Sequence, residues 1–205
     1  MRISERLRIP IVSGLAAVAC GRGSAVGVPS AEWARLSRSC SESAPATSLP
    51  KARFDSLPID VDSVGQDGRW AKVAPQIPGG WGGGLFLEDG FPTIYLTDPG
   101  RNPDALAALN RLGVDGHAWG VDVHVRRGRW NFTQLYSWYR YINYHMGSIA
   151  LSGTDIDEAR NRLQYWVTTD AAKRNLEAQL SAMGVPCFLV SIDIRPLATP
   201  AAPDG

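Results

Sequence analysis

The chain has 205 residues and is nearly neutral, with 21 Lys and Arg residues against 20 Asp and Glu residues. Without residues 1–19 it would hold 18 basic and 19 acidic residues, a formal charge of −1. This balance gives no reason to expect nucleic acid as a partner, because nucleic-acid-binding domains concentrate positive charge on one face.

Residues 1–19 have the pattern of a secretory signal peptide. Three arginines precede an apolar stretch, residues 9–19, that is too short to span a bilayer as a helix. Cys20 follows small residues, as in a bacterial lipobox, although Ala17 stands where a lipobox usually has Leu. The run 17–19 also suits an ordinary A-x-A cleavage site. We favour lipidation at Cys20, which would anchor the exported chain in the bacterial cell envelope as a lipoprotein.

The cysteine count supports that choice, because lipidation of Cys20 leaves an even pair, Cys40 and Cys187. In an oxidising compartment these two could form a disulfide that encloses nearly the whole mature chain. Loop-entropy reasoning assigns such a bridge at most about 4–5 kcal/mol. The alternative is two separate thiols, with Cys187 half-buried at the start of a strand.

Composition predicts the domain boundaries. Residues 20–68 are rich in Gly, Ser, Ala and Pro, which predicts a lipidated N-terminus and a flexible tether. Residues 69–196 are long enough for a single α+β domain with its own core. Residues 197–205 are predicted to be a disordered tail.

Residues 155–194 predict a β-α-β unit. Apolar residues alternate along 163–167, Thr169 and Asp170 can cap a helix, and Leu176 and Leu180 belong to the apolar stripe of that helix. Gly184 and Pro186 end the helix, and alternation resumes along 188–194.

Residues 84–125 carry a degenerate copy of this unit, 71 positions earlier in the chain. Leu96 falls on Val167, Leu109 on Leu180, Gly113 on Gly184, and residues 121–123 on 192–194. Agreement of a strand, a helix stop and a second strand favours duplication over chance. The fold class predicted is α+β, with two β-α-β-type repeats, a mainly antiparallel sheet common to both, and helices on one face.

Residues 131–146, between the repeats, predict a helix rich in aromatic residues. One face is predicted to be buried, and aromatic residues spread around the rest. That buried face comprises Phe132, Leu135, Tyr139, Ile142 and Met146. The residues that spread around the rest, which we predict as a protein-binding surface, are Tyr136, Trp138, Tyr141 and Tyr144.

Three polar or glycine-rich stretches have ordinary structural interpretations. Residues 78–84 hold five glycines but lack the Lys-Ser/Thr pair of a P-loop, so a bulged start of a strand is favoured. Residues 126–129 are basic and are predicted to be a solvated hairpin tip rather than an anion site. The charged run 155–162 is predicted to be a solvated loop.

No cluster of residues in the sequence points to catalysis. His117, His124 and His145 are not brought together by the predicted elements, so neither a metal nor another cofactor is expected. The chain has no G-x-S-x-G turn and no recognisable Cys-His pairing.

The two units, with GGLFLEDGFPTIYLTD in the first and the D-x-x-x-N-R motif of residues 157–162 in the second, resemble the pro-regions of α-lytic and streptogrisin-type secreted serine proteases. They are equally similar to stand-alone bacterial extracytoplasmic proteins of unknown role. The resemblance spans about residues 82–194. It implies a folding helper or inhibitor that adds a sheet to a protease, which this chain would have to do in trans.

Our main expectation is a non-catalytic envelope lipoprotein that binds a protein or peptide. An exposed strand edge or the helix at 132–146 would be its contact surface. The pro-region-like inhibitor or folding helper is the alternative. An unrecognised hydrolase comes third, and a pocket that gathers Asp122, His124 and another titratable group would support it.

Overall fold

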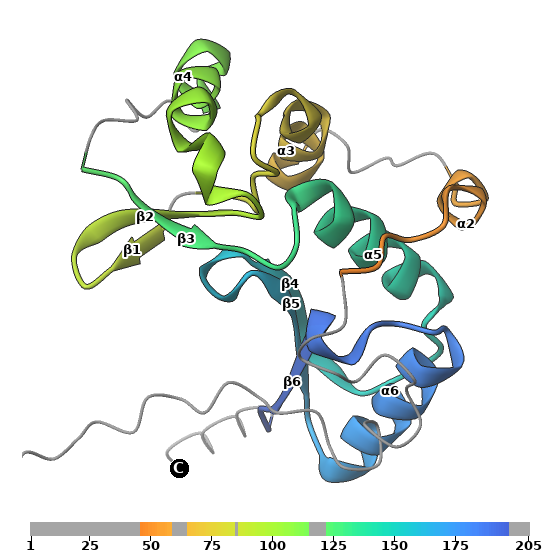
Figure 1. The fold of residues 1–205 in the computed structure, drawn as a ribbon. Coiled ribbons are helices and arrows are strands. Elements are labelled where there is room, and N and C mark those ends of the chain that lie inside the picture. The colour runs from red at the N-terminus through yellow and green to blue at the C-terminus, as the bar shows by residue number, and fades with distance from the viewer. Residues whose placement is uncertain (1–45, 59–64, 85, 115–121, 197–205) are drawn as a thin grey trace, which may run out of the picture.

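The computed structural model describes residues 46–58, 65–84, 86–114 and 122–196 (Figure 1). Its helices are α2 (Lys51–Asp55), α3 (Gln66–Val73), α4 (Asn102–Leu112), α5 (Phe132–His145) and α6 (Asp170–Ala182). Its strands are β1 (Phe86–Glu88), β2 (Phe91–Leu96), β3 (His124–Arg127), β4 (Leu151–Asp157), β5 (Arg162–Val167) and β6 (Val190–Ile194). The predicted signal peptide, Cys20, Cys40 and the predicted tail lie outside the described residues.

Two units with the same topology make up the α+β fold. Each consists of a hairpin followed by a helical crossover, and the two sheets have the orders β1-β2-β3 and β4-β5-β6. In both, the central strand pairs antiparallel with the strand before it and parallel with the strand after the helix. The predicted fold class and the repeat are confirmed, but the strands form two three-stranded sheets instead of one common sheet. The placement of all helices on one face stays a prediction.

The spacing of 71 residues holds for most of the repeat. It maps β2 onto β5, and it maps Gly113 onto Gly184, which both adopt the left-handed conformation (φ 61° and 71°) that ends a helix. The last strand breaks the spacing. Thr93 pairs with His124 in one sheet and Gln164 with Ser191 in the other, so the equivalent residues of β3 and β6 are 67 apart. The predicted match of 121–123 with 192–194 was therefore wrong.

The core joins matching apolar residues of the two units. Leu96, Val167, Leu109 and Leu180 are all fully buried, as the repeat predicts. Helix α5 links the units and runs beside β4 and β5 (Figure 1). It begins at a capping box, in which the Asn131 side chain accepts from the Gln134 N–H and the Gln134 side chain accepts from the Asn131 N–H.

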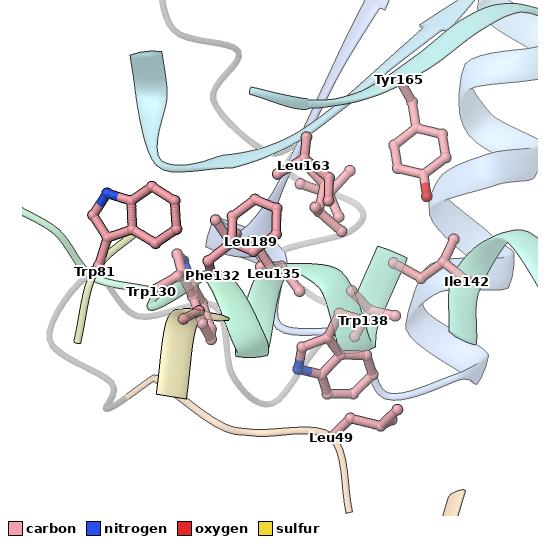
Figure 2. Close-up of a cluster of buried hydrophobic side chains, with 14 of the residues drawn as sticks. Leu49, Trp81, Trp130, Phe132, Leu135, Trp138, Ile142, Leu163, Tyr165 and Leu189 are labelled. Carbon is pink, nitrogen blue, oxygen red and sulfur yellow. The ribbon is translucent and has the colours of Figure 1, made fainter. Parts of the chain in front are cut away.

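The segment 46–58 packs against α5, so part of the predicted tether belongs to the folded domain. Trp138 Nε1 donates to the Thr47 carbonyl at 2.8 Å, and Leu49, beside Trp138 in Figure 2, is 8% exposed. Arg53 Nη1 donates to the Met183 carbonyl beyond α6 at 3.0 Å. The described domain therefore begins upstream of the predicted boundary at residue 69.

Candidate functional site

An apolar groove of about 480 Å³ lies between α2, α3 and α5. Most of its accessible surface is apolar, although several lining residues are polar, and its described lining includes two lysines and no acidic residue. The described lining residues are Ser48, Leu49, Lys51, Phe54, Gly68, Ala71, Lys72, Thr133, Gln134, Tyr136 and Ser137.

The groove exists because three separate segments meet with small residues between them. Gln134 Nε2 donates to Ser48 Oγ at 3.0 Å, which holds the segment before α2 against α5. The Arg140 guanidinium lies 5.4 Å from the centre of the Phe54 ring and fixes α2 on the same helix. Gly68 and Ala71 on α3 supply little side-chain volume, so space remains between the walls.

The predicted binding surface on α5 is only partly at the surface. Tyr136 lines the groove, and Tyr144 is 57% exposed. Tyr141 is half-buried and packs against the rings of Trp138 and His145. Trp138 was placed wrongly, because it is 2% exposed and belongs to the core. The segment 46–58 covers Trp138. The spacing of apolar residues within 131–146 cannot predict this burial, because the covering segment is distant in the sequence.

A second site lies where the β4–β5 turn meets the first unit (Figure 1). Asn161 is 5% exposed and has a left-handed backbone, with φ 52°. Its Oδ1 accepts from the N–H groups of Arg129 at 2.7 Å and Trp130 at 2.8 Å. Its Nδ2 donates to the Trp130 carbonyl at 2.7 Å. This one side chain satisfies three backbone groups of the connection between β3 and α5, a role that sequence reasoning missed.

The glycine-rich segment 78–84 packs against the same turn. Trp81 forms an isolated antiparallel bridge with Leu96, so the segment runs along β2. A Cβ atom at Gly82 would come 2.5 Å from Asn161 Nδ2, and one at Gly83 would collide with the Glu158 side chain. Because Gly82 and Gly83 have no side chains, the two units can approach each other closely here. The segment therefore differs from a phosphate-binding loop and also from the bulged start of a strand that the sequence favoured.

Carboxyl groups gather beside this contact. The pKa of Glu158 is raised from 4.5 to about 8, mainly by burial and to a smaller extent by the charges of Asp155, Asp67 and Asp157, while a backbone hydrogen bond acts in the opposite direction. Burial also raises the pKa values of Asp67 and Asp155. Glu158 therefore carries a proton at neutral pH. The prediction that the run 155–162 is a solvated loop was wrong for most of its length, because residues 155–157 belong to β4, Arg162 begins β5, and Asn161 between them is buried.

Of the residues considered for metal binding or hydrolysis, His117 lies outside the described residues, and the described ones are dispersed. His124 is exposed on β3 and stacks on Phe91 with ring centres 4.6 Å apart, and His145 ends α5. Neither His124 nor Asp122 is part of the described lining of the groove. Within the ranges that the structure describes, no group of three His, Cys, Asp or Glu side chains could hold a metal ion.

Cys187 is disulfide-bonded, and both other cysteines of the chain lie outside the described residues. The choice of Cys40 as its partner stays a prediction. Among the described helices, none has the length and apolar character needed to cross a membrane.

No protein-family model matches the chain, and a search of curated proteins finds no match. The resemblance to protease pro-regions therefore stays a prediction from the sequence.

Proposed function

We propose that the protein is a non-catalytic binding module of the cell envelope, anchored through Cys20, which holds a peptide segment of a protein partner in the α2–α3–α5 groove. The observation that carries the proposal is the groove itself, because its apolar walls and volume suit one or two bulky apolar side chains. Tyr136 lines it from the predicted contact helix, and aromatic residues are enriched where proteins bind partners.

The charges around the groove select the kind of peptide. Lys51 and Lys72 are the charged residues in its described lining, so a partner segment with acidic residues beside an apolar anchor complements it. Lys51 already pairs with Asp55 across one turn of α2. Exposed lysines of this kind steer and select a partner, while the apolar contact supplies most of the affinity.

Filling the groove should weaken peptide binding strongly. Ala71→Trp places an indole between α3 and α5, so peptides selected on the immobilised protein from a displayed random library should bind the variant at least about tenfold more weakly. The matched control is Ala178→Trp, which adds the same indole at an exposed position of α6 outside the described lining of the groove and should leave binding unchanged. Equal binding to wild type and Ala71→Trp, with both folded by circular dichroism, would contradict the groove as the site.

Anchoring is tested separately. In the bacterial host, labelled palmitate should be incorporated into the wild type and lost on Cys20→Ser, because the thiol carries the lipid in a lipoprotein. Cys40→Ser serves as the control and should retain the label. Persistent labelling of the Cys20→Ser chain would remove the lipoprotein assignment while leaving the groove proposal intact.

A further inference from the structure

The segment 46–58 lies on the surface of the domain and adds little to its core. Leu49 is its one buried residue, and none of the residues of α2 is buried. A segment with few buried apolar contacts and exposed hydrogen bonds can detach while the rest of a domain stays folded. Three solvent-exposed hydrogen bonds hold it to α5 and to the turn after α6, from Gln134 Nε2 to Ser48 Oγ at 3.0 Å, from Arg140 Nη2 to the Pro58 carbonyl at 2.7 Å and from Arg53 Nη1 to the Met183 carbonyl at 3.0 Å.

A disulfide restrains this segment from its upstream side. Cys187 is fully buried and disulfide-bonded. The chain has three cysteines, and the other two, Cys20 and Cys40, both precede residue 46. With either partner, the segment 46–58 belongs to a loop that the bond closes, so the bond limits how far the segment can move from α5. With Cys40 as the partner, only about 20 Å of extended chain would separate the bond from Ala46.

The same segment forms one wall of the groove. Ser48, Leu49, Lys51 and Phe54 belong to the described lining, and the other lining residues come from α3 and α5. Figure 2 shows Leu49 beside Trp138, the residue of α5 that the segment covers. If the segment detaches, the groove loses this wall and Trp138 loses its cover.

We propose that the disulfide of Cys187 is a redox switch, which holds the segment 46–58 against α5 and on reduction releases it and opens the groove. The reductant is a dithiol. One of its thiolates attacks the disulfide and forms a mixed disulfide, and its second thiol then displaces the remaining cysteine. Two electrons pass to the protein, which gains two thiols, while the dithiol becomes a disulfide. Release of the segment goes beyond the proposed function, and only its effect on peptide binding rests on that function.

The first measurement needs no peptide. The Trp138 indole N–H donates to the Thr47 carbonyl at 2.8 Å, so its hydrogen exchange in ¹⁵N NMR spectra reports whether the segment is in place. Dithiothreitol should speed this exchange at least about tenfold in the wild type. Cys187→Ala should do so without reductant, because it removes the bond directly. Trypsin should then also cut after the exposed Lys51 and Arg53 at least about tenfold faster.

Two controls separate local release from damage to the core. Val190→Ala truncates a side chain that is 1% exposed on β6 but keeps the disulfide, so Trp138 should exchange as slowly as in the wild type. Tryptic cleavage after Arg174, within α6, should stay slow in both variants, because α6 remains folded. The switch is overturned if Cys187→Ala leaves the exchange unchanged, if Val190→Ala speeds it equally, or if cleavage after Arg174 accelerates as well.

The second measurement is binding of the peptides selected on the wild type. Cys187→Ala should bind them at least about tenfold more weakly than Val190→Ala does, because the released segment no longer completes the groove. Faster Trp138 exchange with unchanged peptide binding would support the switch and contradict the groove as the peptide site. Unchanged exchange in Cys187→Ala would overturn the switch and leave the peptide site intact.

Discussion

Replacing Asn161 with alanine should lower the free energy of unfolding by about 4 kcal/mol. The substitution removes all three hydrogen bonds that join the β4–β5 turn to Arg129 and Trp130, and it leaves those backbone groups buried without partners. Alanine must also adopt the left-handed backbone, at φ 52°, which adds about 1 kcal/mol. Urea unfolding followed by tryptophan fluorescence measures the change.

Two variants separate these contributions. Asn161→Gly relieves the backbone strain but still lacks the hydrogen bonds, so it should recover only about 1 kcal/mol of the loss. Asn143→Ala is the matched control, because the Asn143 side chain accepts one hydrogen bond, from the Tyr165 hydroxyl at 3.0 Å, and should cost about 1 kcal/mol. If Asn161→Ala lowers the free energy of unfolding no more than Asn143→Ala does, the hydrogen bonds of Asn161 contribute little to holding the two units together.

Glu158 should make the protein less stable as the pH rises. Burial raises the pKa of Glu158 from 4.5 to about 8, so the folded state binds this proton more tightly than the unfolded state does. Stability should therefore fall between about pH 4.5 and pH 8 and level off above that range. The full shift would correspond to about 5 kcal/mol, and the solvent contact of a partly exposed side chain reduces our expectation to about 3 kcal/mol.

Glu158→Gln isolates this effect, because glutamine is neutral at every pH. The variant should show a flatter stability curve and should exceed the wild type by about 3 kcal/mol at pH 9, measured by urea unfolding from pH 5 to pH 9. Asp67 and Asp155 should still contribute to the pH dependence of the unfolding free energy in this variant, because burial raises their pKa values too. Asp104→Asn, which removes an exposed carboxylate on α4, should give a curve parallel to the wild type. If the stability curve of Glu158→Gln also runs parallel to that of the wild type, the fall in stability with pH does not come from Glu158.

The repeat was predictable because its signals are local. Alternation along a strand and a glycine after a helix depend on neighbouring residues, so β2, β5 and the helix ends at Gly113 and Gly184 followed from the sequence. The match failed at the last strand because the first unit has a connection four residues longer between its helix end and its paired strand. Periodicity carries no information on the length of such a connection.

The two sites were not predictable, because both arise from contacts between distant segments. The D-x-x-x-N-R motif was visible, but only the fold brings Asn161 to Trp130 and Glu158 to Gly83. Trp138 lies off the predicted apolar stripe of α5 and is buried by residues about 90 positions earlier, through the hydrogen bond to Thr47. The groove has the same origin, since its walls come from α2, α3 and α5.

The turns before β2 and β5 end on equivalent residues, Gly90 and Asn161, which share a left-handed backbone with φ values of 83° and 52°. Asparagine is among the few residues with a side chain that tolerate this conformation, so the second position could acquire a side chain at little conformational cost. The Gly90 turn has no side chain with which to contact another segment, whereas the Asn161 side chain makes three hydrogen bonds to the backbone of Arg129 and Trp130. The same backbone conformation therefore reverses the chain in the first unit, and in the second it also positions a side chain that joins the two units.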